Sequence, residues 1–421
     1  MPLSFNKKIA SLALLLLVMI GCIDQIESGI NAYIDIIVVD GRLTNLAEEQ
    51  VVRINRSKAE YGLFGSLPIS NAVVELVVNN SMVIAFTEKN NQAGEYILPA
   101  GFRANIGDAY QLRIKLADGR QYESTIQVMP KVPAIEKVSV RFNAEEPFSS
   151  KSAFKGVHSF YLDTKDPVEQ ENFYSWEWTA YEKKKWCRTC QSGVYVVNEI
   201  LPGQYRFSQY YVSGDKLFED CFTQPTATGL GVPAIVNEKW NYDYKCRTEC
   251  WEIIHNEEMN LFDDRNINGG QIQSRKIARL PYYQFNGALV EIRQASLTKD
   301  AYQFYRFFQE QTRNNGGIAD TPPTALKGNI RNINNDRENV VGFFTVSAVS
   351  SVRYWLDRKD TGKLEPPGLF EGMNERNPSE EPLPPEKPYI LIWGGPPRVP
   401  TATCLNSATS TPEKPVGWIG D

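Results

Sequence analysis

The sequence predicts a mainly β protein: an N-terminal β-sandwich, a larger β-rich domain with one amphipathic helix, and a Pro-rich C-terminal tail. Three observations support this class. Residues 31–130 are almost entirely β-branched and aromatic runs separated by turn residues. Residues 297–314 carry the one convincing helical period. Residues 366–400 contain ten of the 25 prolines, so we expect neither helix nor central strand there.

The N-terminus has the order of a bacterial export signal. Two lysines precede an apolar segment, residues 9–20, which is too short to cross about 30 Å of hydrocarbon as a helix. The segment ends in Met19-Ile20-Gly21-Cys22, which looks like a lipobox whose cysteine, Cys22, becomes lipidated. An ordinary secretory signal with an incidental cysteine is the alternative. We expect residues 1–21 to be removed and residues 22–30 to link the anchor to the first domain.

Length and charge restrict the functional classes. A chain of 421 residues suggests two or three domains. Its formal charge is -5, and removal of residues 1–21 takes away Lys7 and Lys8 and changes it to -7. A mildly acidic protein is a poor candidate for binding nucleic acid, because phosphate neutralisation requires clustered Lys and Arg.

The first domain, residues 31–130, shows the alternation of a half-buried sheet. Tyr110, Leu112 and Ile114 fall on one face of a strand, and polar residues between them fall on the other. Asp118-Gly119 then predicts a hairpin turn. Three segments, "PISNAVVEL", "AGEYIL" and "GDAYQLRIKLADGRQYES", together resemble the transthyretin-like, carboxypeptidase-regulatory-like sandwich, an Ig-like β-sandwich common on surface and transport proteins of Bacteroidetes.

The second domain, residues 131–365, begins at the proline boundary of residues 130–133. Its most conspicuous feature is an aromatic alternation of Tyr174, Trp176 and Trp178. Such a stripe could form a platform that stacks a sugar or a peptide, but it more often packs the inside of a sandwich. Both interpretations remain open from the sequence.

The predicted helix has its apolar residues at helical spacing, and glycines after residue 315 end it. Ser296 or Thr298 can cap its start. The stripe consists of Leu297, Ala301, Phe304, Tyr305 and Phe308. Residues 340–356 then predict a long strand pair or a bent strand, and the tail, residues 366–421, is expected to dock on the body.

Seven cysteines remain to be assigned. Six are left if Cys22 carries lipid, and an exported protein favours disulfides among them. The candidates are Cys187, Cys190, Cys221, Cys246, Cys250 and Cys404, with Cys404 expected to tie down the tail. A four-thiolate zinc site made by the Cys187/Cys190 and Cys246/Cys250 pairs is the alternative. Six cysteines allow fifteen pairings, so the sequence leaves the connectivity open.

Catalytic motifs are scarce. The two histidines, His158 and His255, lie far apart without metal-ligand spacing. The chain has no Gly-x-Ser-x-Gly elbow and no phosphate-binding Gly-rich loop. Adjacent carboxylates such as Glu257-Glu258 are expected to be solvated, although two carboxylates across a cleft could serve a glycosidase. We therefore predict no catalytic residues and no cofactor.

One segment, "DRNINGG", has the spacing of half a calcium loop. Asp264, Asn266 and Asn268 place oxygens at alternate positions, and Gly269 provides the sharp turn. The twelfth position is Arg275, a cation where such a loop has glutamate. A polar turn is the favoured interpretation, with calcium as the weaker one.

The region from Leu297 to Leu356 resembles the DUF4249 family of Bacteroidetes lipoproteins. The shared motifs are the Leu-Thr helix start, Pro322-Pro323, Gly328-Asn329-Ile330 and Val341-Gly342-Phe343-Phe344. "DPVEQENFYSW" and "CRTECW" also fit. Where family members often have two cysteines near the C-terminus, this chain has one, so the partner of Cys404 stays open.

The resemblance implies a lipid-anchored outer-membrane protein, often encoded beside a TonB-dependent β-barrel transporter. We expect an accessory or substrate-binding partner of such a transporter in nutrient uptake. An exported hydrolase of peptides or glycans and a free-standing adhesin are the alternatives. Asp24 and Glu27, which follow the lipobox, favour the cell surface over the periplasmic face.

Overall fold

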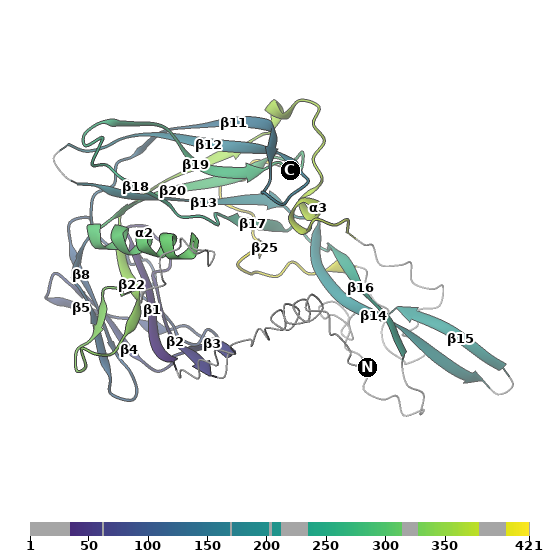
Figure 1. Ribbon diagram of the computed structural model, residues 1–421, viewed down its shortest axis with the longest axis horizontal. Helices are drawn as coiled ribbons and strands as arrows, with labels where there is room; N and C mark the ends of the chain where they lie inside the picture. The colour runs from purple at the N-terminus through teal and green to yellow at the C-terminus, as the bar shows by residue number, and fades with distance from the viewer. Residues whose placement is uncertain are drawn as a thin grey trace, which may run out of the picture.

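The computed structural model describes residues 34–60, 63–168, 171–201, 204–211, 235–313, 327–378 and 401–420. Of residues 34, 35, 58–60, 63, 64, 190–201, 204–211, 235–242 and 313, it describes the backbone alone. The described chain is mainly β, as the sequence predicts, with two β-sandwiches and a projecting β arm (Figure 1). Within these ranges no helix combines the length and apolarity needed to span a membrane.

The first sandwich packs two six-stranded sheets face to face. One sheet has the order β22-β1-β2-β7-β6, with β3 also paired to β2; its strands are β1 (Ile34–Thr44), β2 (Val51–Glu60), β3 (Leu63–Pro68), β6 (Thr87–Glu88), β7 (Glu95–Ile97) and β22 (Val340–Ser347). The other has the order β21-β9-β8-β4-β5, with β10 paired to β8; its strands are β4 (Val73–Val78), β5 (Met82–Ala85), β8 (Ala109–Lys115), β9 (Gln121–Ser124), β10 (Gln127–Val128) and β21 (Ile330–Asn332).

The alternation of apolar and polar residues in the sequence determines which side chains face the core between these sheets. In β8, Tyr110, Leu112 and Ile114 are buried in the core between the sheets, and the residues between them face outward. Gly119 adopts a φ of 91°, which favours glycine, and closes the predicted hairpin between β8 and β9. The half-buried strand and its turn are therefore confirmed.

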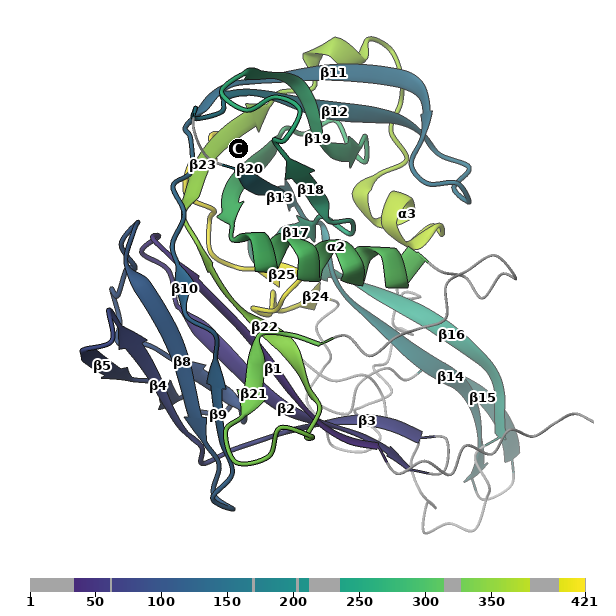
Figure 2. The same ribbon diagram turned by 60° about the vertical axis from the view of Figure 1, so that its left-hand side comes forward.

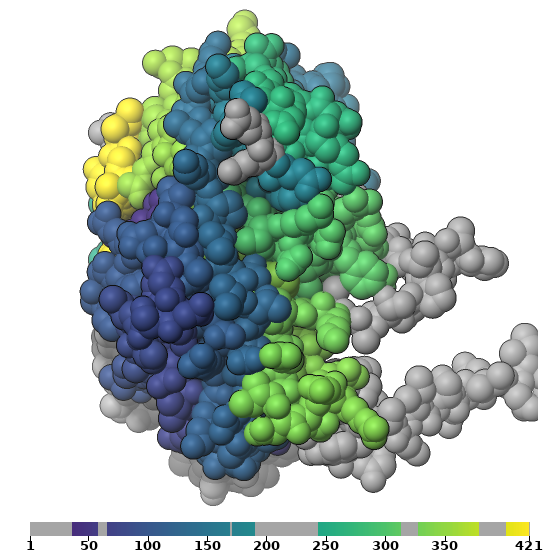
Figure 3. All heavy atoms as spheres, turned by 90° about the vertical axis from the view of Figure 1, so that its left-hand side faces the viewer, coloured from purple at the N-terminus to yellow at the C-terminus, as the bar shows by residue number. Residues whose placement is uncertain are grey.

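The first sandwich extends beyond the expected range of residues 31–130. Strand β22 pairs in parallel with β1, from Ile37 beside Val340 to Thr44 beside Ser347, and β21 pairs with β9. Phe344 and Val346 of β22 are buried in the same core as β1. Figure 3 shows this light green segment continuing the blue surface of the sandwich. The first domain is therefore discontinuous in sequence. Strand β22 pairs with the edge of β1 and adds apolar side chains to the core, and no local sequence pattern identifies this distant partner.

The family-like motifs around residues 328 and 342 lie where this late segment joins the sandwich. Gly342 has a φ of 109°, and a Cβ on it would lie 1.9 Å from the carbonyl oxygen of Val39. A Cβ on Gly328 would lie 1.4 Å from the carbonyl oxygen of Gly342. Asn329 donates to the carbonyl of Phe344 (3.0 Å) and accepts from its N–H (2.8 Å). These residues have a structural role in closing the sandwich.

The second domain is another sandwich. Its small sheet has the order β11-β12-β19, with β11 (Ile135–Pro147), β12 (Lys155–Lys165) and β19 (Gln271–Pro281). Its larger sheet has the order β23-β20-β13-β17-β25, with β18 paired to β13; the strands are β13 (Phe173–Lys183), β17 (Trp251–His255), β18 (Asn260–Asp263), β20 (Ala288–Leu297), β23 (Val349–Leu356) and β25 (Ser410–Thr411). A 3-10 turn, η1 (Lys359–Thr361), follows β23.

The bent strand of residues 340–356 connects the two sandwiches. β22 lies in the first and β23 in the second, and the chain bends between them at Ala348 (Figure 2). Ala348 is fully buried, and its N–H donates to the hydroxyl of Ser296 (3.1 Å). The two domains are thereby joined through continuous backbone.

The helix α2 (Lys299–Arg313) lies below the second sandwich, beside the first (Figure 1). Thr298 caps it, because its hydroxyl accepts from the N–H of Ala301 (3.3 Å). Ala301 is fully buried, and Phe304 contacts Phe343 of β22 (ring centroids 5.0 Å apart). Phe308, at the end of the predicted stripe, is exposed.

Three long strands form an arm that projects from the second domain (Figure 1). The arm is β14 (Trp186–Leu201), β15 (Gln204–Tyr211) and β16 (Ile235–Cys246), with the short β24 (Thr401–Ala402) parallel to β16.

The described part of the tail docks as expected. Trp418 is buried and packs edge-on against Trp355 and Trp251, with ring centroids 5.0 and 5.9 Å away. One expectation for the tail is wrong: α3 (Leu369–Asn374) is a helix inside residues 366–400. The prolines permit it because residues 366 and 367 precede the helix and the next proline follows at 378.

Candidate binding cleft

A cleft of about 720 Å³ opens along one side of the second sandwich. Its long walls are β19 and the β17–β18 segment, which belong to different sheets. Strand β19 is the last strand of the small sheet, so its outer edge has no neighbouring strand there. Helix α3 and Gln309 of α2 also line the cleft.

The floor is apolar and belongs to the core of the second domain. Trp178 of β13 and Ile254 of β17 come from the larger sheet, and Ile277 and Ala278 come from β19. Ile277 and Ala278 are consecutive, yet both are buried, because the register with β12 skips one residue between Lys276 and Ala278. This β-bulge directs two neighbouring side chains to one face.

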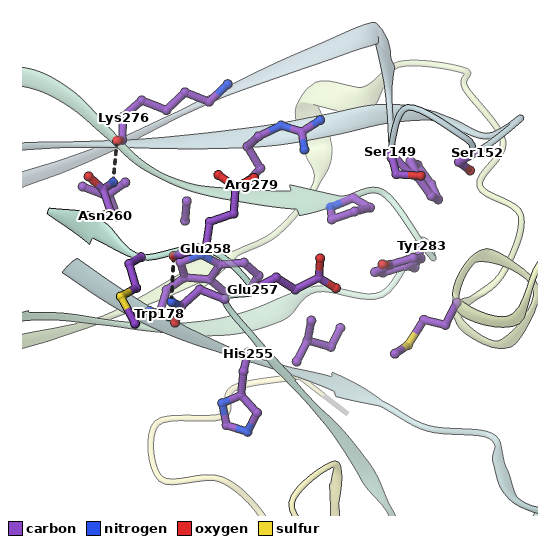
Figure 4. A pocket seen from close by; sticks show the side chains of 18 of the residues that line it. Ser149, Ser152, Trp178, His255, Glu257, Glu258, Asn260, Lys276, Arg279 and Tyr283 are labelled. Atoms are coloured by element: carbon purple, nitrogen blue, oxygen red, sulfur yellow. Dashed lines mark hydrogen bonds between the residues drawn. The ribbon is translucent and has the colours of Figure 1, made fainter. Parts of the chain in front are cut away.

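The walls carry both signs of charge. On β19, Arg279 forms an ion pair with Glu146 (2.6 Å), and Lys276 lies 3.6 Å from the same carboxylate. On the opposite wall, Glu257 and Glu258 lie in the loop after β17 and are exposed. Figure 4 shows Glu257 extending into the middle of the cleft. The cleft therefore presents an acidic loop opposite a basic strand above an apolar floor.

Arg275 fastens β18 to β19. Its guanidinium lies over the rings of Trp176 and Phe262 (5.4 and 5.2 Å) and donates to the Oδ1 of Asn260 (2.7 Å). The amide of Asn260 donates in turn to the carbonyl of Lys276 (3.0 Å), as Figure 4 shows. Burial lowers the pKa of Arg275. We assign this arginine to holding the cleft walls together.

Tyr283 closes one end. Its ring meets that of Phe148 edge-on at 5.2 Å, and a Cβ on Gly372 of α3 would lie 2.5 Å from the tyrosine ring. Burial raises the pKa of the Tyr283 hydroxyl, and the nearby Glu182 carboxylate raises it further. Tyr283 therefore remains a neutral phenol, and α3 can approach this closely only with glycine at position 372.

His255 lies on the cleft wall with both ring nitrogens engaged. Its Nε2 lies 3.1 Å from the carbonyl of Ala408, which can only accept, so Nε2 carries the proton. Its Nδ1 then accepts from the hydroxyl of Thr179 (3.3 Å). Figure 4 shows the imidazole pointing away from Glu257, with Ser149 and Ser152 at the far end. In the described cleft, no serine hydroxyl is paired with an imidazole.

The aromatic alternation predicted from the sequence divides between the core and the cleft. Tyr174 and Trp176 are 0% and 1% exposed, so a ligand cannot reach their ring faces. The platform interpretation is wrong for these two residues, because β13 lies between β20 and β18 in the centre of the larger sheet. Trp178 is also largely buried, but its edge lines the cleft floor.

Four of the candidate cysteines form two neighbouring disulfides, Cys187–Cys246 and Cys250–Cys404. The sulfurs of Cys187, Cys250 and Cys404 all lie within 4.8 Å of one another. The four-thiolate zinc alternative is not formed, because the tail brings Cys404 to Cys250. Cys22, Cys221 and the side chain of Cys190 lie outside the described residues.

The calcium-like spacing of Asp264, Asn266 and Asn268 does not produce a converged ligand set. Residues 264–270 form a turn, as the favoured interpretation predicted. Asp264 is fully buried, whereas Asn266 and Asn268 are exposed. The turn directs these side chains to different sides.

Sequence reasoning missed the cleft itself. In the sequence, Glu257 and Glu258 are only two adjacent carboxylates that are expected to be solvated. The sequence gives one weak signal of the β-bulge, because the apolar residues Ile277 and Ala278 are adjacent within β19.

Comparison with known proteins gives one match. A family model described as "Domain of unknown function (DUF4249)" matches residues 23–353. No curated protein and no solved structure matches the chain.

Proposed function

The chain belongs to the DUF4249 family, and on that basis we propose that it is a lipid-anchored outer-membrane protein that serves a TonB-dependent transporter as an accessory or substrate-binding partner. Within that role, the cleft between β19 and the β17–β18 loop is the ligand-binding surface. The observation that carries this proposal is the cleft itself, about 720 Å³ with an apolar floor and charged walls.

The size and lining of the cleft suit a small polar ligand. Binding pockets of about 300–1,000 Å³ combine apolar walls with a few polar groups that orient the ligand. Trp178 and Ile254 provide apolar floor area, the acidic Glu257 lines one wall, and Arg279, paired with Glu146, lines the other. A ligand with both signs of charge, such as a short peptide, matches this arrangement.

Export and anchoring are supported by the N-terminal sequence and by the cysteines. The lipobox ending in Cys22 supports a lipid anchor, and two disulfides suit an oxidising compartment. The acidic Asp24 and Glu27 favour the cell surface, although the periplasmic face is the other possible location.

We propose binding in preference to catalysis. His255 is the one histidine on the cleft wall, and it donates to Ala408 and accepts from Thr179. A general base needs a nitrogen free to take a proton from a nucleophile within about 3 Å. The hydrolase alternative requires the tail to leave His255, so a full chain that cleaves neither peptides nor glycans would argue against it.

Co-purification tests the proposal. The tagged chain is expressed in its native cells, membranes are extracted with a mild detergent, and bound proteins are identified by mass spectrometry. We expect enrichment of an outer-membrane β-barrel transporter. A Cys22→Ala variant serves as the control for anchoring and should leave the membrane fraction.

Two results would contradict the proposal. One is a chain that never enriches a transporter, even after crosslinking. The other is a Cys22→Ala variant that stays in the membrane fraction. Protease treatment of intact cells then distinguishes the two faces, because only a surface-exposed chain is cleaved.

A further inference from the structure

Asp166 and Asp264 are two buried carboxyl groups at one end of the second sandwich. Each follows the last residue of a strand, Asp166 after β12 and Asp264 after β18. They are 1% and 0% exposed, and the two carboxyl groups lie close enough to interact electrostatically. Neither residue lines the cleft described above.

Of the four carboxyl oxygens of Asp166 and Asp264, three accept a hydrogen bond and one does not. The Tyr174 hydroxyl and the Gly269 N–H donate to Asp166, at 2.6 and 2.9 Å. The Asn172 amide donates to Oδ2 of Asp264 (3.2 Å). Oδ1 of Asp264 is buried and accepts no hydrogen bond from any described residue. A buried polar atom without a hydrogen bond indicates that a further group, such as a bound ion or a proton, interacts with it.

The pair also lacks a compensating cation. Among the described residues, no Lys or Arg forms an ion pair with either carboxyl; the nearby Arg265 is bound to the exposed side of Asp263 instead. Buried carboxylates are expected to be paired, to coordinate a metal or to take up a proton. The choice is therefore between a bound cation and a shared proton.

We infer that Asp166 and Asp264 together bind a divalent cation, with Ca²⁺ as the preferred ion. Both residues offer hard oxygen ligands, which Ca²⁺ accepts in irregular arrangements. Mg²⁺ demands near-octahedral geometry and gives up its water reluctantly, which does not suit a fully buried pair. Zn²⁺ favours sulfur and nitrogen ligands, and none is present in this cluster.

The turn that follows β18 contacts both members of the pair. Residues 264–269 have the spacing of the first half of a calcium loop but lack the acid at the twelfth position. Asp166 supplies a second carboxylate from a distant part of the chain, and Gly269 of the loop donates to it. Asn266 and Asn268 of this spacing are exposed, so among the described residues the side-chain ligands at this place are Asp264 and Asp166 alone.

Terbium luminescence and thermal unfolding test the site on the full mature chain after treatment with a chelator. Tb³⁺ replaces Ca²⁺ at oxygen sites, and Tyr174, hydrogen-bonded to Asp166, would sensitise its emission. We expect sensitised emission that CaCl₂ displaces. We also expect the Tm to rise by about 3–6 °C when Ca²⁺ exceeds its Kd 100-fold.

Matched variants localise the effect. Asp264→Asn should lose both the emission and the Ca²⁺-dependent rise in Tm, because it removes a ligand charge. Asp263→Asn removes the same charge one residue away and should keep both. A wild-type chain without Tb³⁺ emission and without a Ca²⁺-dependent Tm overturns the inference and assigns a shared proton to the pair. Equal losses in both variants overturn it as well.

Discussion

Arg358 and Glu182 form an ion pair with 1% and 0% side-chain exposure, in which the guanidinium reaches both carboxylate oxygens. Arg358 lies just after β23 in a left-handed conformation (φ 56°), and Glu182 lies in the central strand β13. The guanidinium also donates to the carbonyls of Gln284 and Asn286 (2.7 and 2.8 Å). The pair thus fixes the turn after β23 to the middle of the sheet.

Removing one partner of this pair should be strongly destabilising. Arg358→Met leaves the Glu182 charge buried, and we expect a loss of about 3–5 kcal/mol in the free energy of unfolding, measured with urea. The double variant with Glu182→Gln should cost less than the sum of the single changes, because no uncompensated charge remains. Lys299→Ala, which breaks the exposed pair with Glu171, should change stability by under about 0.5 kcal/mol.

Gly342→Ala should destabilise the first sandwich. The new Cβ would meet the carbonyl of Val39 in a backbone conformation that favours glycine. We expect a cost above about 3 kcal/mol, or no folded protein at all. Gly101→Ala is the matched control, because Gly101 has a φ of 80° but open space around it. Equal costs for the two variants would show that the backbone angle, and not the close approach, matters at position 342.

A fragment of residues 31–130 should not fold independently. It lacks β22, so the β1 edge loses its parallel partner and the core loses Phe344 and Val346. Far-UV circular dichroism and amide exchange should show a largely unprotected chain. Linking residues 327–347 to the fragment should restore cooperative unfolding. A fragment that folds without that addition would contradict the discontinuous domain.

Loss of the Cys250–Cys404 bond should release the end of the tail. The bond closes a separation of 154 residues, and for loops of this length the chain-entropy model gives a contribution of about 4–5 kcal/mol. In the Cys250→Ala, Cys404→Ala variant we expect a glutamate-specific protease to cut after the exposed Glu413 before the body is degraded. Trp418→Ala keeps the disulfide and should show much slower cleavage. Equal cleavage of both variants would mean that Trp418 alone holds the tail.

His158 should make stability depend on pH. Burial lowers the pKa of this imidazole, and the carboxylate of Asp360, 3.1 Å from Nε2, opposes the shift only in part, while Arg358 reinforces it. The unfolded chain takes up the proton at about pH 6.5. This group's contribution to stability is therefore complete above pH 6.5 and is lost as the pH falls toward the lowered pKa of the folded state.

Urea unfolding between pH 8 and 5 checks this sign. His158→Phe should lose less stability on acidification than the wild type does. Asp360→Asn removes the group that raises the pKa, so the loss should extend to lower pH. If all three proteins show the same pH profile, His158 does not carry the effect.

Local pattern predicted the parts of the fold that depend on neighbours in sequence. The alternation around Leu112, the turn at Gly119 and the helix around Ala301 follow from side-chain period and turn chemistry. The parallel pairing of Ile37 with Val340 could not be predicted in this way, because neither strand carries a sequence signal that specifies so distant a neighbour. The Cys250–Cys404 pairing was open for the same reason.

The cleft was beyond sequence reasoning for a physical reason as well. Its walls are the edges of two different sheets, and their separation is set by the packing of Arg275 over Trp176 and Phe262. Glu257 and Lys276 carry no local signal that they face a common space. Sequence alternation alone does not separate core residues from cleft residues. Trp176 and Trp178 belong to the same alternating stripe, yet Trp176 is in the core and Trp178 lines the cleft.

The parallel pairing of β1 with β22 has a consequence for the order of folding. The first sandwich begins at Ile34 but cannot close its sheet until Ser347 is available. Contacts between distant parts of a chain form slowly, because the intervening loop must first be ordered. We therefore expect β1 to stay open while the chain emerges N-terminus first, until residues 340–347 are available to pair with it. Under the proposed export, the N-terminal domain would therefore still be open when the chain crosses the membrane.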